Sequence, residues 1–297
     1  MVKMVFKWFG EDDNVTLEQI SQIPEIYGVT RPMGSLRGDG AAPRYEISGT
    51  VEYAAGAGLA LEVVEDFTIH EEIKLREGNY SRHIDDFKET IVRFSKSGIK
   101  CICYSFSPMS DKSARGSDDQ LAVKYAKLGS EGLWRNYELF VAEVVPVAEK
   151  HGVNLAIYPD CHSRTTPEMP CLVASERDID RLLALDKSRS HGVVMWSLGL
   201  GCEKFDDFRM MSRKYGAMGR IHFVDVGNLS AGAADMPTLL KTYHSADFDG
   251  YMGLRGSTPD WNDSVMRNVA SGASYIAGIW NTLDKFNFLD DSGAQAP

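Results

Sequence analysis

The sequence predicts an α/β fold consisting of a single (β/α)8 TIM barrel. The chain has 297 residues, and such a barrel needs about 250. Short apolar or β-branched runs alternate with longer runs of helical periodicity, which is the pattern of repeated strand–helix units. No Pro-, Ser- or Gly-rich linker divides these units. We therefore expect one domain over residues 1–288 and a disordered tail at 289–297.

Strands are expected where short apolar runs occur, after a first strand that ends near Trp8. Residues 59–64 (LALEVV) are a clear case, because they are apolar and partly β-branched. The further expected strands are residues 100–104, 153–158, 192–195, 220–226 and 251–254.

Helices are expected between these strands. Ile84, Phe87, Ile91 and Phe94 follow one another at spacings of three and four, which places them on one face of a helix. Gly152 follows a long helical run and is the residue type that commonly ends a helix. The expected helices are residues 84–97, 133–151, 176–185, 204–215, 236–245 and 264–285.

Two regions lack both patterns. Residues 31–49 are rich in Gly, Pro and Arg, and we expect an irregular loop there. Residues 108–130 are polar and long, as expected of a βα loop or a lid. Both are expected at the carboxyl-terminal face of the barrel.

Composition excludes several classes of protein. The chain is 43% hydrophobic and 25% charged, which argues against disorder, collagen-like repeats and a coiled coil. Its net charge is −10, from 42 acidic and 32 basic residues. Such a chain is a poor partner for nucleic acid or an anionic membrane, since both attract cations. A small-molecule substrate is the expected partner.

The cysteine content and hydropathy indicate a cytoplasmic protein. Five cysteines do not make a disulfide framework, and an odd number leaves one thiol unpaired. Cys101 and Cys103 lie two apart in an apolar run, so we expect both on one side of a strand, in the core. No apolar run approaches a transmembrane length, and the amino terminus lacks a signal-peptide pattern.

Several segments, in order over residues 4–280, resemble the manganese-dependent mannonate dehydratases. The matching segments are 6–13 (FKWFGEDD), 63–65 (VVE), 69–74 (IHEEIK), 98–100 (GIK), 103–108 (CYSFSP), 146–149 (PVAE), 197–199 (SLG) and 220–224 (RIHFV). The resemblance implies a TIM barrel of the xylose-isomerase-like kind. It also implies a lyase in which a sugar acid loses water to give a 2-keto-3-deoxy acid. The family tends to self-associate, so a homo-oligomer is compatible with it.

The resemblance departs from the family at the metal ligands. The family holds its metal with His, Cys, His and Asp at the ends of successive strands. Here Tyr158 stands at the first position, Val194 at the second, Asp225 at the third, and the segment 253–256 (GLRG) aligns with the fourth. Valine has no lone pair and arginine repels a cation, so we expect the manganese site to be absent and no cofactor to be required. A rebuilt metal site from Asp160, His162, His222 and Asp225 is the alternative.

The expected catalytic residues lie at strand ends, where TIM barrels carry their chemistry. Asp225 is expected to act as a general base or, alternatively, to form a structural salt bridge. Arg255 would bind a substrate carboxylate or stabilise an enolate, unless it is an exposed loop residue. Tyr158 would hydrogen-bond a substrate oxygen or donate a proton, unless it merely fills the space of the lost metal.

A second group of residues is expected to bind substrate. Each has a structural alternative: a turn former, a surface or core histidine, a charged turn or an apolar core side chain. The group consists of Trp8, Glu65, His70, Tyr104, Asp160, His162, Arg164 and His222. For His222 the core alternative is favoured, because it lies three residues before Asp225 and so on the other face of the strand.

The sequence therefore predicts a lyase that removes water from a sugar acid or related polyhydroxylated carboxylate. Two alternatives stay open. One is a sugar isomerase or epimerase with a rebuilt metal site, and the other is a non-catalytic binding protein on the same barrel.

Overall fold

In the computed structural model, eight parallel strands form a closed barrel in chain order, and β1 pairs with β8 to complete the ring. The predicted TIM barrel is therefore confirmed. The structure describes residues 2–11, 13–33, 44–110, 118–159, 169–196, 200, 205–226, 235–254 and 263–293. The strands are β1 (Lys3–Lys7), β2 (Ile26–Pro32), β3 (Ala60–Thr68), β4 (Cys101–Ser105), β5 (Asn154–Ile157), β6 (His191–Trp196), β7 (Ile221–Asp225) and β8 (Tyr251–Leu254).

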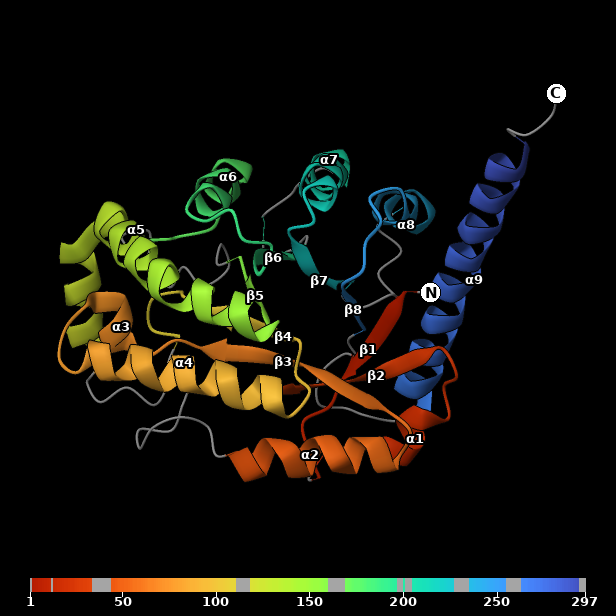
Figure 1. The fold of residues 1–297 in the computed structure, drawn as a ribbon, viewed down its shortest axis with the longest axis horizontal. Helices are drawn as coiled ribbons and strands as arrows, with labels where there is room; N and C mark the ends of the chain where they lie inside the picture. Colours follow the sequence, from red (N-terminus) through yellow and green to blue (C-terminus); the bar gives the residue numbers. More distant parts are fainter. Residues whose placement is uncertain are drawn as a thin grey trace.

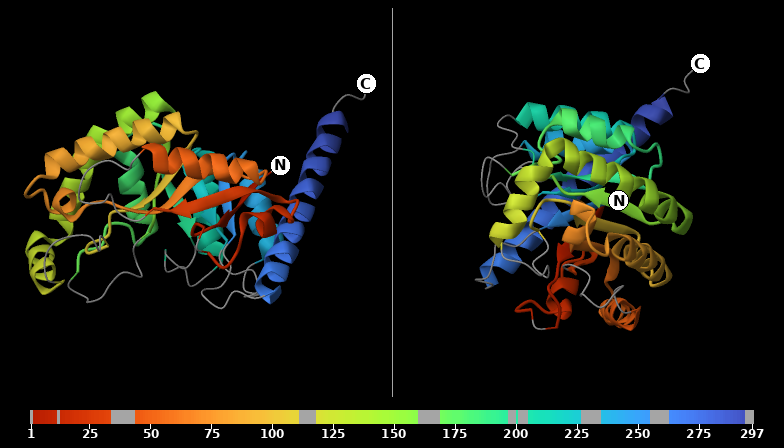
Figure 2. Two further views of the ribbon diagram at one scale, coloured as in Figure 1. Left: turned by 90° about the horizontal axis from the view of Figure 1, so that it is seen from below. Right: turned by 90° about the vertical axis from the view of Figure 1, so that its left-hand side faces the viewer.

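Helices surround the barrel, and the end of the last helix extends past the other elements (Figures 1 and 2). The apolar stripe expected on α4 is buried, and Gly152 follows α5 with a φ of +64°. The helices are α1 (Leu17–Ser21), α2 (Arg44–Gly56), α3 (Glu71–Leu75), α4 (Tyr80–Lys96), α5 (Asp118–His151), α6 (Glu176–Ala184), α7 (Phe205–Ala217), α8 (Met236–His244) and α9 (Asp263–Gly293). Among the described residues, no helix is long and apolar enough to span a membrane.

The predicted boundaries of the irregular loop at residues 31–49 are both wrong. The strand β2 runs to Pro32, and the helix α2 begins at Arg44. The strand β2 itself was not predicted, since Gly28 and Pro32 interrupt its β pattern. Gly28 is required there: a Cβ at this position would lie 2.1 Å from the Ala60 carbonyl oxygen of β3. Residues 34–43 lie outside the described part.

The expected loop at residues 108–130 is also shorter than predicted, because α5 already begins at Asp118. Leu121 and Tyr125 form its buried face, but the polar residues around them hide this spacing in the sequence. The helix changes direction at Gly129, which has a φ of +66°. The lid function expected of residues 108–130 stays a prediction, and residues 111–117 of that segment lie outside the described part. The domain boundary at 288 stays a prediction, and α9 reaches Gly293.

Two apolar layers hold the barrel together. The larger one lies between the sheet and the helices, and the smaller one fills the barrel interior. Cys101 and Cys103 both belong to the interior layer, with their sulfur atoms 3.9 Å apart, as the sequence predicts. Side chains along a strand alternate between the two sides. The inward-facing residues one step beyond the interior layer therefore include Lys7, Glu65, Tyr158, Trp196 and Asp225.

Candidate active site

Glu65 is the centre of a hydrogen-bonded cluster at the carboxyl-terminal mouth of the barrel. Its side chain is 2% exposed. Thr30 on β2 donates its hydroxyl hydrogen to Oε1 of Glu65, and Tyr158, which follows β5, donates to Oε2 over 2.6 Å. The Nζ atom of Lys7 lies 3.8 Å from the same Oε2. Side chains from β1, from β2 and from the residue after β5 thus hold this carboxylate of β3 in place.

A second carboxylate, Asp66, reaches Lys7 from the adjacent position. Lys7 Nζ donates to Asp66 Oδ2 over 2.5 Å, and the lysine side chain is 9% exposed. Successive strand residues normally point to opposite sides. Asp66 departs from this alternation because its φ is +52° and the pairing of β3 with β4 shifts register between Val64 and Phe67. Such local strain and irregularity commonly occur at functional sites.

Asp225 ends β7 in the same inward-facing layer. It is 3% exposed and pairs in register with Trp196 of β6 and Gly253 of β8. The indole of Trp196 packs against the interior apolar layer. The mouth therefore combines a buried carboxylate on an apolar side with a lysine, a tyrosine and two more carboxylates opposite. That combination is suited to moving protons at a bound organic acid.

Two predicted site residues, Trp8 and Tyr104, lie elsewhere in the barrel wall. Trp8 belongs to the outer layer, where its ring lies 6.0 Å from that of Tyr53 on α2. Tyr104 also faces outward, and its hydroxyl lies 2.8 Å from that of Tyr137 on α5. Burial raises the pKa of Tyr104 above its usual range. Neither side chain joins the cluster around Glu65, and their predicted substrate contacts are not part of the site that we build.

His222 lies near the amino-terminal end of β7, on the opposite face from Asp225. A Cβ on Gly192 would lie 2.5 Å from its ring, which shows how closely β6 and β7 enclose it. Burial lowers the pKa of His222 to about 4, so it is neutral at pH 7. The position agrees with the core alternative. The predicted metal set of Asp160, His162, His222 and Asp225 therefore cannot converge through His222.

His70 caps α3 on the rim of the barrel, where its Nδ1 accepts the Glu72 N–H over 3.1 Å. The remaining predicted residues lie outside the described part of the chain. They are Asp160, His162, Arg164 and Arg255. Their roles stay predictions.

Lys7, Thr30 and Asp66 were missed by the sequence analysis. Lys7 lies two residues after the apolar Val5, so period-two counting along the first strand indicates its inward direction. Thr30 was not identified because the strand that carries it, β2, was not predicted. Asp66 had no sequence signal, because its direction depends on the irregular pairing of β3 with β4.

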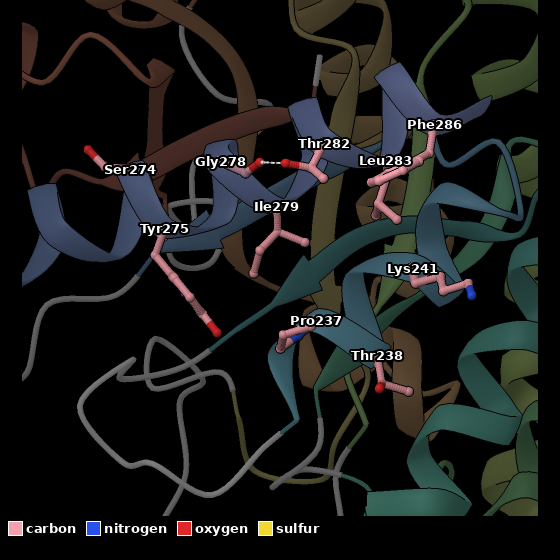
Figure 3. Close-up of a pocket in the computed structure, with 10 residues that line it drawn as sticks. All are labelled: Pro237, Thr238, Lys241, Ser274, Tyr275, Gly278, Ile279, Thr282, Leu283 and Phe286. Carbon is pink, nitrogen blue, oxygen red and sulfur yellow. Dashed lines mark hydrogen bonds between the residues drawn. The ribbon is translucent and has the colours of Figure 1, made fainter. Parts of the chain in front are cut away.

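A groove lies away from this mouth, between α8 and α9. It has a volume of about 630 Å³ and is lined only by α8 and α9, among others by Lys241, Tyr275 and Ile279 (Figure 3). No strand residue contributes to it. The groove therefore lies outside the barrel, within the ring of helices.

A closed parallel barrel with acid–base groups at the carboxyl ends of its strands defines the class of TIM-barrel enzymes. The family model "D-mannonate dehydratase (UxuA)" matches residues 2–120 and 116–290. The chain therefore belongs to the mannonate dehydratase family, as its sequence resemblance predicts, and is a carbon–oxygen lyase by that membership.

Individual relatives agree with this assignment. A mannonate dehydratase of Thermotoga petrophila is 30% identical over 96% of this chain and 98% of its own length. Mannonate dehydratase 2 of Halalkalibacterium halodurans is 27% identical over 95% and 99%. The alignment with the Thermotoga protein spans 355 residues, which exceeds the 297 of this chain. The relative therefore has insertions that this chain lacks.

Solved structures give the same fold. A mannonate dehydratase from Streptococcus suis serotype 2 superposes with a TM-score of 0.80 at 25% identity, covering 94% of each chain. A D-psicose 3-epimerase from Clostridium cellulolyticum H10 has a TM-score of 0.68 at 12% identity, covering 94% of this chain and 99% of its own. The second likeness concerns the barrel fold alone.

The described mouth does not offer the donor set of the family's metal. Val194 faces the barrel interior among apolar side chains and has no lone pair. The Tyr158 hydroxyl donates to Glu65. Within the described ranges, the one group of three His, Cys, Asp or Glu residues with ligand atoms close together lies on the rim. We therefore derive no reaction step through a metal at the mouth.

Proposed function

We propose that the chain is a dehydratase that removes water from a sugar acid, or from a related small polyhydroxylated carboxylate, without the manganese of its family. The observation that carries this proposal is the cluster of Lys7, Glu65 and Tyr158. It supplies a fixed cation and a hydroxyl donor at the mouth, where the resemblance has Tyr158 and Val194 in place of metal ligands. Family membership supports the reaction class.

Elimination from such a substrate needs a base, a stabilised enolate and an acid for the leaving group. Asp225 takes the proton from the carbon next to the substrate carboxylate. The electron pair of that C–H bond forms the carbon–carbon double bond as the C–O bond of the next carbon breaks. The departing hydroxide is protonated to water, and the enol that remains changes to the keto acid.

The other mouth residues have separate roles in this step. The Lys7 ammonium stabilises the negative charge that develops on the substrate carboxylate, since a preorganised cation is most effective in a site sheltered from water. The Tyr158 hydroxyl, whose single hydrogen is bonded to Glu65, hydrogen-bonds a substrate oxygen or passes its proton to the leaving group when that hydrogen turns from Glu65 to the substrate. Glu65 holds both in position. Arg255 is the second cation that we expect at the substrate carboxylate.

The experiment is a product assay with purified protein and a panel of hexonates and pentonates, including D-mannonate. Formation of a 2-keto-3-deoxy acid from one of them supports the proposal. Epimerised sugars from a parallel ketose panel would contradict it and favour the isomerase alternative. Binding of a sugar acid without any product would instead identify a non-catalytic binding protein.

A further inference from the structure

Three side chains on the rim of the barrel form a compact group that the proposed reaction does not use. His70 caps α3, Glu72 lies in the first turn of α3, and His83 lies near the start of α4. The two imidazole rings are stacked, with centroids 3.8 Å apart and an angle of 18° between their planes. One ligand atom from each residue lies within 4.8 Å of the other two.

The backbone fixes the carboxylate of this group. Asn79 N–H donates to Glu72 Oε2 over 2.6 Å. Gly78 has a φ of +56°, and a Cβ there would lie 2.6 Å from the carboxyl carbon of Glu72. Only glycine therefore allows the chain to fold so closely over the carboxylate. The Glu72 side chain is 34% exposed and that of His83 18%, so solvent still reaches the group.

We propose that His70, Glu72 and His83 form a binding site for a divalent first-row transition metal, with Zn²⁺ as the reference ion. Two imidazole nitrogens and one carboxylate oxygen are a common protein ligand set for Zn²⁺, with water in the fourth position. Calcium and magnesium prefer oxygen ligands alone. Ligand atoms about 2 Å from a tetrahedral zinc lie roughly 3.3 Å apart. The Glu72 Oε2 to His83 Nε2 distance is already 3.3 Å.

His70 is the ligand that must turn when the metal enters, because imidazole lone pairs lie in the plane of the ring and two rings stacked at 18° cannot both point at one ion. Its bonding changes as well. A neutral imidazole has one acceptor nitrogen, and in His70 the Nδ1 atom accepts the Glu72 N–H. Metal binding therefore replaces the side-chain cap of α3. The loss of one capping bond is small against the binding free energies of zinc sites.

The location gives the ion a structural role. Helix α3 follows β3, which carries Glu65 and Asp66. Glu71 of the same helix accepts a hydrogen bond from the backbone of Met109, in the segment after β4. A metal that joins α3 to α4 would hold this part of the rim in place without contacting the reacting substrate.

The test uses the full chain after removal of metal with a chelator. Zn²⁺ is titrated in competition with a chromophoric chelator, and Co²⁺ binding is followed by its visible absorption. The variants are His83→Gln and Glu72→Gln. The matched control is His244→Gln, which changes a histidine that pairs with Asp284 far from the rim.

The wild type and the His244→Gln control are expected to bind one equivalent of Zn²⁺. The His83→Gln and Glu72→Gln variants should each bind it at least about tenfold more weakly, as expected when one of three ligands is lost. Circular dichroism confirms that each variant is folded. Equal affinity of wild type and both rim variants would place any bound metal elsewhere and overturn the proposal, as would a wild type that binds no equivalent.

Discussion

Tyr158 donates a 2.6 Å hydrogen bond to Glu65 across the mouth of the barrel, from the residue after β5 to the carboxylate on β3. The strand between them, β4, does not contribute to this bond. The resemblance to the mannonate dehydratases places Tyr158 where the family has a metal-binding histidine. A hydroxyl that is held by a buried carboxylate thus occupies the position of a metal ligand.

Removal of the Tyr158 hydroxyl should impair catalysis while the fold is kept. In Tyr158→Phe the ring still packs against the interior layer, but Glu65 loses a hydrogen-bond donor and the substrate loses the hydroxyl that turns to it from Glu65. We expect kcat to fall by about 10²-fold, the magnitude typical for one such donor. Steady-state kinetics of the dehydration reaction measure this effect.

The control for this variant is Tyr27→Phe. Tyr27 also donates to a glutamate, Glu62, over 3.1 Å, but it is exposed and lies near the opposite end of the strands. The control should keep the wild-type rate. Equal rates for wild type and Tyr158→Phe would show that the hydroxyl has no part in the reaction.

Asp225→Asn should abolish proton abstraction with little change in shape. Asparagine keeps the size of the side chain but is not a base at neutral pH. General acid–base groups contribute about 10²- to 10⁴-fold to rate, so we expect kcat to fall in that range with a smaller change in KM. Asp249→Asn, an exposed aspartate before β8, is the control. Unchanged turnover of the Asp225 variant would remove the base assignment.

Lys7→Met should reduce both stability and activity. The substitution leaves Glu65, which is 2% exposed, without its nearby cation. Loss of one partner from a buried ion pair costs about 3–5 kcal/mol, and the exposure of Asp66 places this case at the lower end. Urea unfolding measures the loss, and kcat should fall by about 10²-fold. Lys3→Met, on the same strand, is the control for the strand itself.

An acid-dependent loss of stability is expected from two buried histidines. Burial lowers the pKa of His222 to about 4 and that of His191 to about 3. An unfolded histidine titrates near 6.5, so between these values the unfolded state binds more protons than the folded one. The stability contributed by each neutral histidine is therefore complete above about pH 6.5. It declines as the pH falls, by about 1.4 kcal/mol per pH unit for each residue.

Urea unfolding of wild type and His222→Gln at pH 7 and pH 5 tests this expectation. The variant should lose less stability between the two pH values than the wild type, because one titrating group is gone. The comparison removes the contribution of carboxylates, which both proteins share. Identical pH dependence would show that folding does not lower the pKa of His222.

The sequence predicted most of the barrel because its strands and helices have regular hydrophobic periods. The short strand at 251–254 and the helix α6 were found nearly to the residue. The strand β2 was missed because its pattern is interrupted by Gly28, which the close approach of Ala60 requires. The inward direction of the Lys7 side chain could have been predicted from the alternation of side chains along the first strand. The contact of Asp66 with Lys7 could not be predicted, because it depends on a left-handed backbone conformation that no pattern of side chains encodes.

Two of the predicted site residues do not reach the mouth of the barrel, because of the side of the strand on which they lie. Tyr104 and His222 lie on the correct strands, but their side chains face away from the mouth. For His222 the spacing from Asp225 already indicated this. For Tyr104 the spacing from Cys103 indicates it as well, because neighbouring residues on a strand point to opposite sides.

The initial rate of 2-keto-3-deoxy acid formation from the best sugar acid, measured after exhaustive chelation and again after addition of Mn²⁺, decides whether the mouth works without a metal. We expect the same rate in both measurements, and a rate that falls strongly in Tyr158→Phe under both conditions. A rate that disappears on chelation and returns with Mn²⁺ would contradict this expectation. The acid–base cluster of Lys7, Glu65 and Tyr158 would then not replace the metal.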